Sequence, residues 1–330
     1  MNASAIKTNG KYGLVADIGA TNARFAIADE GGVHEAITLQ CADHANLVDA
    51  AEHYLKLISA NGNTPRAGMI AIAGPVQGDV FEMTNHAWRF SIKDTQAKLH
   101  FDHLRVMNDF EAIAYAVPKM DPAYIEQIGG GQAKAQGTIG VVGPGTGLGV
   151  AGLVWGGNDY IVNAGEGGHV TMPARSFREY ELIDQLHYKY RHISAERVCS
   201  GKGLVNLYEA IRSFDEISIQ DAPDLTPEAI AQKALDNSCK ICVEALDLMY
   251  GFLGTIAGNL ALTYGAHGGV YIAGGITTKL GDYIHNSRFR EEFVRKGRFE
   301  NYLAEIPTFL IKHDNIAFVG LHNQLLKALK

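Results

Sequence analysis

The chain has 330 residues, of which 47% are hydrophobic and 20% charged, as in an ordinary soluble globular protein. This length predicts two domains, or one large domain with a deep cleft. A formal net charge of −7 argues against a general nucleic-acid binder, which would present a basic face, but leaves room for small anionic ligands. The polar residues 1–10 have no signal-peptide pattern, so we expect a cytoplasmic protein.

The first informative segment is an apolar run that ends in a short turn of small residues. Residues 14–18 form the run, which contains Asp17, residues 19–22 form the turn, and a second alternating run follows at 23–28. This pattern predicts a β-hairpin whose turn presents backbone N–H groups, a hydroxyl and one carboxylate. Such a turn suits phosphate oxygens, with the carboxylate placed to hold Mg²⁺ through water. An ordinary hairpin turn has the same short pattern, and this alternative stays open.

A second segment repeats the first. Residues 138–142 are apolar, 143–149 form a glycine- and threonine-rich turn, and an apolar run resumes at 150–155. This long-period similarity suggests an internal duplication. Two phosphate-binding hairpins that face each other across a cleft are typical of the actin-like ATPase fold, which includes the hexokinases. Neither turn is a Walker A loop, and the second lacks the final glycine of a dinucleotide-binding loop.

The remaining periodicity predicts a mixed sheet covered by helices. Before the second hairpin we expect, in order, a helix over 47–58, a strand over 68–73, a short helix capped by Ser91, and a strand over 104–107. After it we expect helices over 200–211, from Thr226 onward and over 241–264, a strand from 268 that ends in Gly274 and Gly275, a strand over 308–312, and a last helix over 317–329.

The helix over 241–264 is apolar enough to be compared with a membrane span. It contains three polar residues, so we interpret it as a buried helix of a soluble protein. Gly251, Gly254 and Gly258 lie three and four residues apart, which leaves a smooth stripe where a neighbour can approach closely.

The cysteines predict neither disulfides nor a zinc site. Four cysteines in a chain of this length are no disulfide framework, so we expect reduced thiols. Cys239 and Cys242 have metal-ligand spacing, but no second pair completes a tetrahedral site. We therefore expect two small helix residues and no structural zinc.

Two further segments carry polar groups suited to catalysis or to a sugar. Asn108 and Asp109 follow the strand over 104–107, where open α/β sheets bind ligands, although an aspartate there is also a good helix N-cap. Glu166 and His169 lie among three glycines, so the chain must turn sharply, and both side chains can hydrogen-bond a polyol. A di-iron site would need this motif twice and on helices.

Two weaker candidates are left with alternatives. Glu196 precedes the turn at Ser200 and is either a site residue or a helix surface residue. The segments 73–76 and 84–88 combine a glycine–proline turn with an amide and Trp88, which are common around sugars, but core packing explains Trp88 equally well.

Taken together and in order, eight motifs resemble bacterial glucokinase, the non-ROK family of ATP-dependent glucose 6-kinases. The resemblance runs from about residue 12 to the C-terminus. ROK sugar kinases carry a zinc-binding Cys-x-Cys-Gly-x-x-Gly-Cys segment that this sequence lacks. Ala20 and Pro144 depart from the common pattern. The motifs are Asp17–Arg24, Met83–Trp88, Asn108–Phe110, Gly145–Val150, Gly165–His169, Ser194–Arg197, Ser200–Tyr208 and Ile272–Ile276.

The resemblance implies a two-lobed α/β fold of the actin-like ATPase (ribonuclease H-like) type, with duplicated mixed sheets and a central cleft. The small lobe would comprise residues 1–118, to which a C-terminal helix over 313–330 returns, and the large lobe residues 119–312. The implied activity is ATP-dependent phosphorylation of D-glucose at the 6-hydroxyl, feeding glycolysis. A homodimer is implied as well. A non-catalytic sugar sensor and a kinase for another hexose are the alternatives, although the residues before the first strand leave no room for the DNA-binding motif usual in such sensors.

The resemblance also assigns roles to individual residues. Asp109 would be the general base. Glucose would be bound by Asn108, Glu166, His169 and Glu196. The ATP phosphates and adenosine would be bound by Ala16, Asp17, Ile18, Gly19, Ala20, Thr21, Gly145, Thr146, Gly147, Gly274 and Gly275. Mg²⁺ would be held through water by Asp17. On this assignment, Glu196→Gln weakens sugar binding and leaves ATP binding unchanged.

Overall fold

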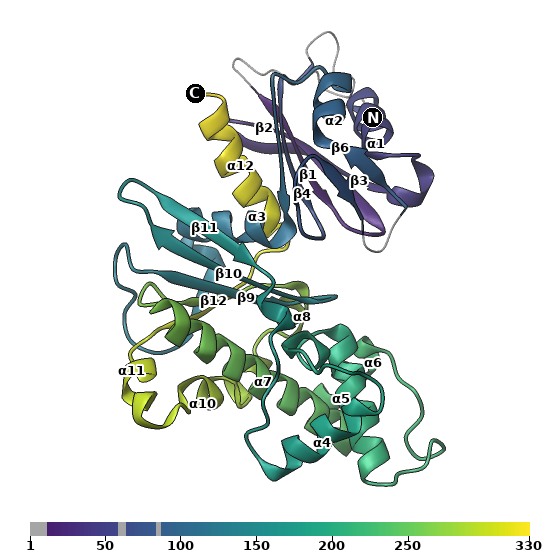
Figure 1. The fold of residues 1–330 in the computed structure, drawn as a ribbon, viewed down its shortest axis with the longest axis vertical. Coiled ribbons are helices and arrows are strands. Elements are labelled where there is room, and N and C mark those ends of the chain that lie inside the picture. The colour runs from purple at the N-terminus through teal and green to yellow at the C-terminus, as the bar shows by residue number, and fades with distance from the viewer. Residues whose placement is uncertain (1–11, 59–63, 84–86) are drawn as a thin grey trace. The chain divides into compact units, whose positions relative to one another are not determined.

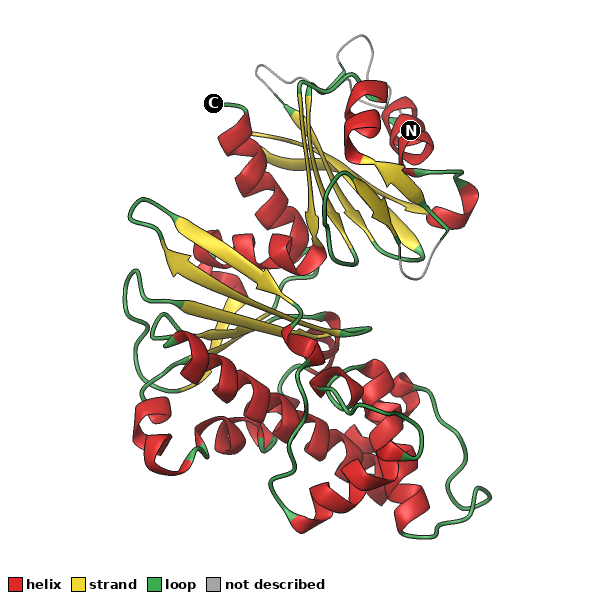
Figure 2. Cartoon of the chain, viewed as in Figure 1, coloured by secondary structure: helices red, strands yellow, loops and turns green. Residues whose placement is uncertain are grey.

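The computed structural model describes residues 12–58, 64–83 and 87–330. The chain divides into two compact units: unit 1 comprises Met1–Met120 with Asn315–Lys330, and unit 2 comprises Asp121–Asp314. Unit 1 is thus assembled from two separate stretches of sequence, whereas unit 2 is continuous. Each unit has its own mixed sheet (Figures 1 and 2). Unit 2 has one buried hydrophobic cluster and unit 1 has two.

Unit 1 is built on a five-stranded sheet in the order β3-β2-β1-β4-β7. β1, β2 and β3 are antiparallel neighbours, which confirms the first predicted hairpin, and β4 and β7 continue the sheet in parallel with β1. The strands are β1 (Gly13–Ile18), β2 (Asn22–Asp29), β3 (Gly32–Gln40), β4 (Ala67–Ile72) and β7 (His103–Asn108).

Helices cover both faces of this sheet. Successive side chains of β1 point to opposite faces, so its apolar residues belong to two different cores. Leu14 and Ile18 belong to the core that includes α1 (Leu47–Leu57) and the surroundings of α2 (Ile92–Lys98). Val15 faces the other core, with α3 (Asp109–Ala116) and α12 (Ile316–Ala328). Figure 1 shows α1 and α2 on one side of the sheet and α12 on the other.

The C-terminal helix α12 packs closely on α3. A Cβ atom at Gly320 would lie 1.8 Å from the carbonyl oxygen of Ala112, so only glycine permits this crossing.

The start of α2, on the opposite face of the sheet, is set by its N-cap. Ser91 accepts a hydrogen bond from the backbone N–H of Asp94, as predicted.

Trp88 packs in the hydrophobic core of unit 1. Trp88 is 2% exposed and donates from Nε1 to the carbonyl of His44 at 3.0 Å. Core packing is therefore the correct interpretation of Trp88, while Thr84, Asn85 and His86 lie outside the described residues. Trp88 directly precedes β6 (Arg89–Ser91), which pairs with β5 (Val80–Glu82).

Unit 2 repeats the sheet topology of unit 1. Its order is β11-β10-β9-β12-β13-β8, in which three antiparallel strands are followed by two parallel ones, with β8 added as an antiparallel edge. The expected internal duplication is thus present in the strand pairing itself. The strands are β8 (Ile125–Gly129), β9 (Ile139–Pro144), β10 (Leu148–Trp155), β11 (Tyr160–Gly165), β12 (Val270–Ile272) and β13 (Thr308–Ile311).

The long helix α7 (Lys240–Tyr264) is the central helix of unit 2. It is long and apolar enough to cross a membrane, but 78% of its most apolar stretch is buried inside the protein, which confirms a core helix. A Cβ atom at Gly254 would lie 2.1 Å from the carbonyl oxygen of Phe289, and one at Gly258 2.4 Å from that of Phe293. The predicted glycine stripe therefore seats α10 (Phe289–Val294) against α7.

Further short elements complete unit 2. The α-helices are α4 (Phe177–His187), α5 (Gly201–Phe214), α6 (Pro227–Leu235), α8 (Gly275–Leu280), α9 (Tyr283–Asn286) and α11 (Glu300–Ala304). Two 3₁₀ turns belong to the candidate site described below, η4 (Gly167–His169) and η5 (Ala195–Arg197).

Candidate active site

The first turn, Gly19-Ala20-Thr21, joins β1 to β2. The N–H of Gly19 donates to the carbonyl of Asn22 at 2.9 Å, and the carbonyl of Thr21 accepts from Cys41 at 2.9 Å. Ala20 is not in the positive-φ region, so alanine is tolerated where the resembling family often has glycine. The turn is therefore a narrow hairpin end with its backbone held on both sides.

Asp17 immediately precedes this turn, in β1 between Ala16 and Ile18. Its carboxylate is 28% exposed and lies opposite Arg24 on β2, with 3.9 Å between the charged atoms. Burial raises the pKa of Asp17, and the charge of Arg24 opposes this shift. A partly desolvated carboxylate is stabilised by any further cation that approaches it.

Asn108 and Asp109 lie where β7 ends and α3 begins. Asn108 is the helix N-cap, because its Oδ1 accepts from the N–H groups of Phe110 at 2.8 Å and Glu111 at 3.2 Å. Asp109 is the first residue of the helix, and its Oδ1 also accepts from Phe110, at 2.8 Å. The interpretation of Asp109 as the N-cap is therefore wrong, since its neighbour has that role.

The second turn, which joins β9 to β10, is shorter than the sequence suggested. Gly143 pairs with Gly149, and Pro144 pairs with Leu148, so only residues 145–147 lie outside the strands. The N–H of Gly145 donates to the carbonyl of Gly147 at 2.8 Å, which closes the turn.

The first residue of α5 holds the same turn from outside. The N–H of Gly201 donates to the carbonyl of Gly145 at 3.0 Å. Ser200 caps α5 by accepting from the N–H of Gly203 at 3.0 Å. The turn and the start of α5 are thus fixed to each other by backbone hydrogen bonds.

A cavity of about 650 Å³ opens beside this turn, entirely within unit 2. Three helices begin at its wall, since Gly201, Pro227 and Gly275 are the first residues of α5, α6 and α8. The positive end of a helix dipole attracts anions, although the N–H of Gly201 is already bonded to Gly145 and Pro227 has no N–H. The other lining residues are Gly145, Thr146, Lys202, Leu204, Glu228, Ala231, Gln232, Leu235, Ile276, Lys279 and Leu280.

The lining of the cavity is mixed. Ala231, Leu235, Ile276 and Leu280 are aliphatic, Lys202 and Lys279 are positively charged, Glu228 is negatively charged, and the turn adds backbone groups. Gly145, Thr146 and Gly275 were predicted from the sequence. Gly147 and Gly274 are not lining residues, although a Cβ atom at Gly274 would lie 2.6 Å from the carbonyl oxygen of Pro144.

Glu166 and His169 flank the sharp turn that was predicted for them. They lie at the two ends of η4, with 4.0 Å between the carboxylate and the imidazole, and both side chains are well exposed. A Cβ atom at Gly168 would lie 2.0 Å from the carbonyl oxygen of Leu148, so this loop rests directly on the start of β10.

Glu196 lies in η5, close to η4. Its Oε2 accepts a hydrogen bond from the backbone N–H of Leu148 at 3.0 Å. The carboxylate thus reaches the residue that follows the Gly145–Gly147 turn, a contact that no sequence signal indicated. Glu196 is thus a partly exposed residue of a 3₁₀ turn whose carboxylate contacts the start of β10, and its role as a site residue stays a prediction.

The predicted site residues are divided between the units. Unit 1 contains the first turn with Asn108 and Asp109, and unit 2 contains the second turn, the cavity and the three residues Glu166, His169 and Glu196. Within unit 2 the structure brings Glu196, the Glu166–His169 loop and the Gly145–Gly147 turn together around Leu148. The sequence did not predict that residues of α6 line the cavity. It indicated only that a helix starts at Thr226.

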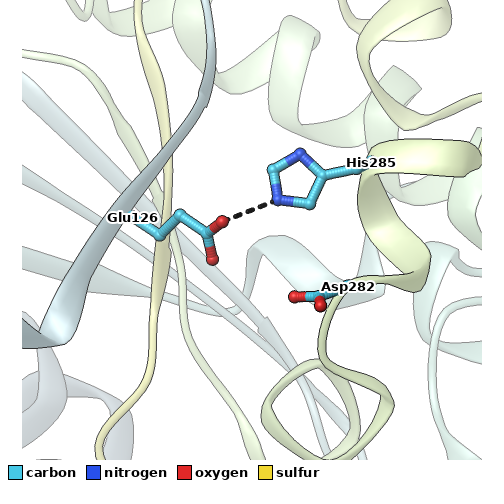
Figure 3. A group of neighbouring side chains, drawn as sticks. All are labelled: Glu126, Asp282 and His285. Carbon is cyan, nitrogen blue, oxygen red and sulfur yellow. Dashed lines mark hydrogen bonds and ion pairs between the residues drawn. The ribbon is translucent and has the colours of Figure 1, made fainter.

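One other group of side chains has the composition of a metal site. Ligand atoms of Glu126, Asp282 and His285 lie within 4.8 Å of one another, and His285 Nε2 is 2.9 Å from Glu126 Oε1 (Figure 3). Lys312 Nζ lies 2.5 Å from Glu126 Oε2 and 3.4 Å from Asp282 Oδ1. Because the lysine ammonium already supplies the positive charge, we interpret the group as an ion-pair network.

Comparison with known proteins agrees with this geometry. The Glucokinase family model matches residues 14–328. A glucokinase of Aromatoleum aromaticum is 47% identical over 320 residues, covering 96% of this chain and 95% of the relative. The crystal structure of a glucokinase from an Antarctic psychrotroph has a TM-score of 0.85 at 35% identity, with coverage of 96% and 99%.

A more distant structure extends the likeness of the fold. A ROK family glucokinase from Streptomyces griseus, in complex with glucose and AMPPNP, has a TM-score of 0.67 at 17% identity, with coverage of 96% and 99%. These neighbours confirm the predicted α/β fold of the actin-like ATPase type with duplicated mixed sheets. The family match spans nearly the whole sequence, and the chain therefore belongs to the glucokinase family.

Proposed function

We propose that this chain transfers the γ-phosphoryl group of ATP to the 6-hydroxyl of D-glucose. The observation that carries the proposal is the cavity at which α5, α6 and α8 begin, beside the Gly145–Gly147 turn, in a member of the glucokinase family. An apolar wall next to anion-attracting groups is what a nucleoside triphosphate requires.

Each unit has its own part in this proposal. The cavity in unit 2 takes the adenosine, and the second turn takes phosphate oxygens through its backbone N–H groups. In unit 1 the first turn offers Thr21 and further N–H groups to the phosphates. Phosphoryl transfer depends on positioning and charge neutralisation more than on covalent chemistry, so preformed turns of this kind are suited to it.

Asp17 fits a Mg²⁺ ion held through water. Its carboxylate is a hard oxygen donor beside the first turn, partly desolvated and 3.9 Å from the guanidinium of Arg24. Mg²⁺ bound there with ATP would neutralise charge on the phosphates. The residue's own contribution is to anchor the hydration shell of the ion while the turn binds phosphate oxygens.

For the sugar, Asn108, Glu166, His169 and Glu196 supply hydrogen-bonding groups, and Asp109 accepts the proton of the 6-hydroxyl as that oxygen attacks phosphorus. Support for Asp109 comes from its neighbour: because Asn108 caps α3, the helix does not need a carboxylate at position 109 for its start. We further place the chain outside the ROK kinases, whose zinc-binding cysteine segment is absent from the sequence. A homodimer and a cytoplasmic location stay predictions.

The activity is tested by measuring ADP release from purified protein with ATP and Mg²⁺ across glucose, mannose and fructose. We expect release that depends on both the sugar and the metal ion, with the largest kcat/KM for glucose. Glucose binding without ADP release would contradict the kinase and favour a sugar sensor. A larger kcat/KM for mannose or fructose would keep the chemistry but reassign the substrate.

The nucleotide cavity is tested by filling it. Ala231→Phe places a ring among the aliphatic residues of α6, so the KM for ATP should rise about tenfold or more as apolar contact with the nucleoside is lost. The KM for glucose should stay within about twofold. Ala229→Phe on the same helix, which does not line the cavity, is the matched control. An unchanged KM for ATP in Ala231→Phe would show that the nucleoside binds elsewhere.

A further inference from the structure

Glu196 is bound to the phosphate turn as well as being a candidate for sugar binding. Its Oε2 accepts from the N–H of Leu148 at 3.0 Å, and a Cβ atom at Gly147 would lie 2.4 Å from the same oxygen. The carboxylate therefore lies directly against the last residue of the Gly145–Gly147 turn. No side chain larger than glycine fits at position 147 while this contact exists.

The backbone of Glu196 is fixed independently of its carboxylate. Its carbonyl accepts from the hydroxyl of Ser200 at 2.8 Å, and Ser200 is the N-cap of α5. The next residue, Gly201, donates to the carbonyl of Gly145 at 3.0 Å. The turn is thus held at its start by α5 and just past its end by Glu196, so the two ends depend on one short segment of chain.

The loop with Glu166 and His169 rests on the same residue, Leu148. Gly168 packs against the carbonyl of Leu148, and Glu166 forms an isolated parallel bridge with Val150 in β10. The two loops are also tied to each other, because Ala195 donates to the carbonyl of Val170 at 2.9 Å. Leu148 therefore contacts both candidate sugar-binding loops. The carbonyl of Leu148 lies against Gly168, and the N–H of Leu148 donates to Glu196.

We propose that Glu196 is a positioning residue that couples sugar binding to the conformation of the phosphate turn; this rests on the proposed function. One carboxylate oxygen, Oε2, holds the N–H of Leu148, and the other, Oε1, accepts a hydrogen bond from a glucose hydroxyl. A carboxylate has lone pairs enough to do both at once. Bound sugar then holds the side chain in the orientation that bonds Leu148, and so favours the conformation of the turn that the nucleotide binds.

Coupling of this kind is reciprocal, so it is measured equally well from either ligand. Calorimetric dissociation constants should be obtained for glucose alone, for the ATP analogue AMPPNP with Mg²⁺ alone, and for each in the presence of saturating amounts of the other. In the unaltered protein we expect each ligand to tighten the other by about fivefold or more, the usual lower range for coupled sites.

Glu196→Gln tests the residue. The amide keeps the shape but replaces one acceptor oxygen with an NH₂ donor, so when its oxygen bonds the N–H of Leu148 the atom that faces the sugar no longer accepts a hydrogen bond. We expect the affinity for glucose to fall about tenfold, the affinity for AMPPNP in the presence of glucose to fall as well, and the mutual tightening to drop below about twofold. Glu166→Gln is the control, because it lies in the sugar loop without a bond to the turn and should weaken glucose while keeping the coupling.

The possible failures are distinct. If the unaltered protein binds neither ligand, the proposed function is wrong. If it binds both without mutual tightening, or if Glu196→Gln weakens glucose and leaves AMPPNP and the coupling intact, the positioning role is wrong while the kinase stands. Equal weakening of both ligands with unchanged coupling would show a structural role only and would also overturn the proposal.

Discussion

Replacing Asp109 with asparagine should lower kcat by a factor of about 10²–10⁴ or more, because the amide cannot accept the proton of the 6-hydroxyl. The dissociation constant for glucose should change little, since the amide oxygen still accepts a hydrogen bond. Stability should also be retained: Asn108 caps α3, and the amide oxygen of the new residue can still accept from the N–H of Phe110. Steady-state kinetics, calorimetry and thermal unfolding check the three statements.

Asp121→Asn is the matched control for this variant. Asp121 also stands at a helix start, where its carboxylate accepts from the N–H of Ala123 at 2.9 Å, but it is not a predicted site residue. Its substitution should leave kcat unchanged. Near-native turnover in Asp109→Asn would mean that the carboxylate is not the base, and the assignment would have to be abandoned.

Gly254→Val should produce the largest loss of stability that we predict. The new side chain would overlap the backbone carbonyl of Phe289, which cannot move without shifting α10, and overpacking of this kind lowers the free energy of unfolding by about 3 kcal/mol or more. Thr263→Val puts the same side chain on an exposed position of α7 and should stay within about 0.5 kcal/mol.

Urea unfolding measures the loss, and hydrogen exchange locates it. Because α7 and α10 belong to the core of unit 2, amides there should lose protection while those of unit 1 keep theirs. An unchanged urea midpoint for Gly254→Val would show that the two helices do not depend on this close approach.

Features encoded by neighbouring residues were predictable from the sequence. The two hairpins, the cap at Ser91 and the buried helix α7 each follow from the spacing of apolar residues and from local hydrogen bonding. Where two adjacent residues were equally suitable, sequence could not decide. Asn108 and Asp109 are both good caps, and only the direction in which each side chain points shows that Asn108 has the role.

Features that depend on pairing across the fold were not predictable. Gly143 and Gly149 resemble turn residues, but they face each other across β9 and β10, because glycine is tolerated in a strand as well as in a turn. The bond from Leu148 to Glu196 joins positions 48 residues apart. From the sequence alone, Glu196→Gln is predicted to leave ATP binding unchanged. The bond between Glu196 and Leu148 is a reason to expect that the same substitution weakens ATP binding.

The return of α12 to unit 1 has a consequence for the order in which the chain folds as it is made. A ribosome produces residues from the N-terminus onward, and domains fold as their sequence becomes available. Residues 121–314 are contiguous, so unit 2 has its whole core once Asp314 has emerged. One face of the sheet in unit 1 still lacks Phe318, Leu321 and Leu325 at that moment. The half that is synthesised first is thus completed last, and until then it exposes an uncovered apolar face to chaperones and to other nascent chains.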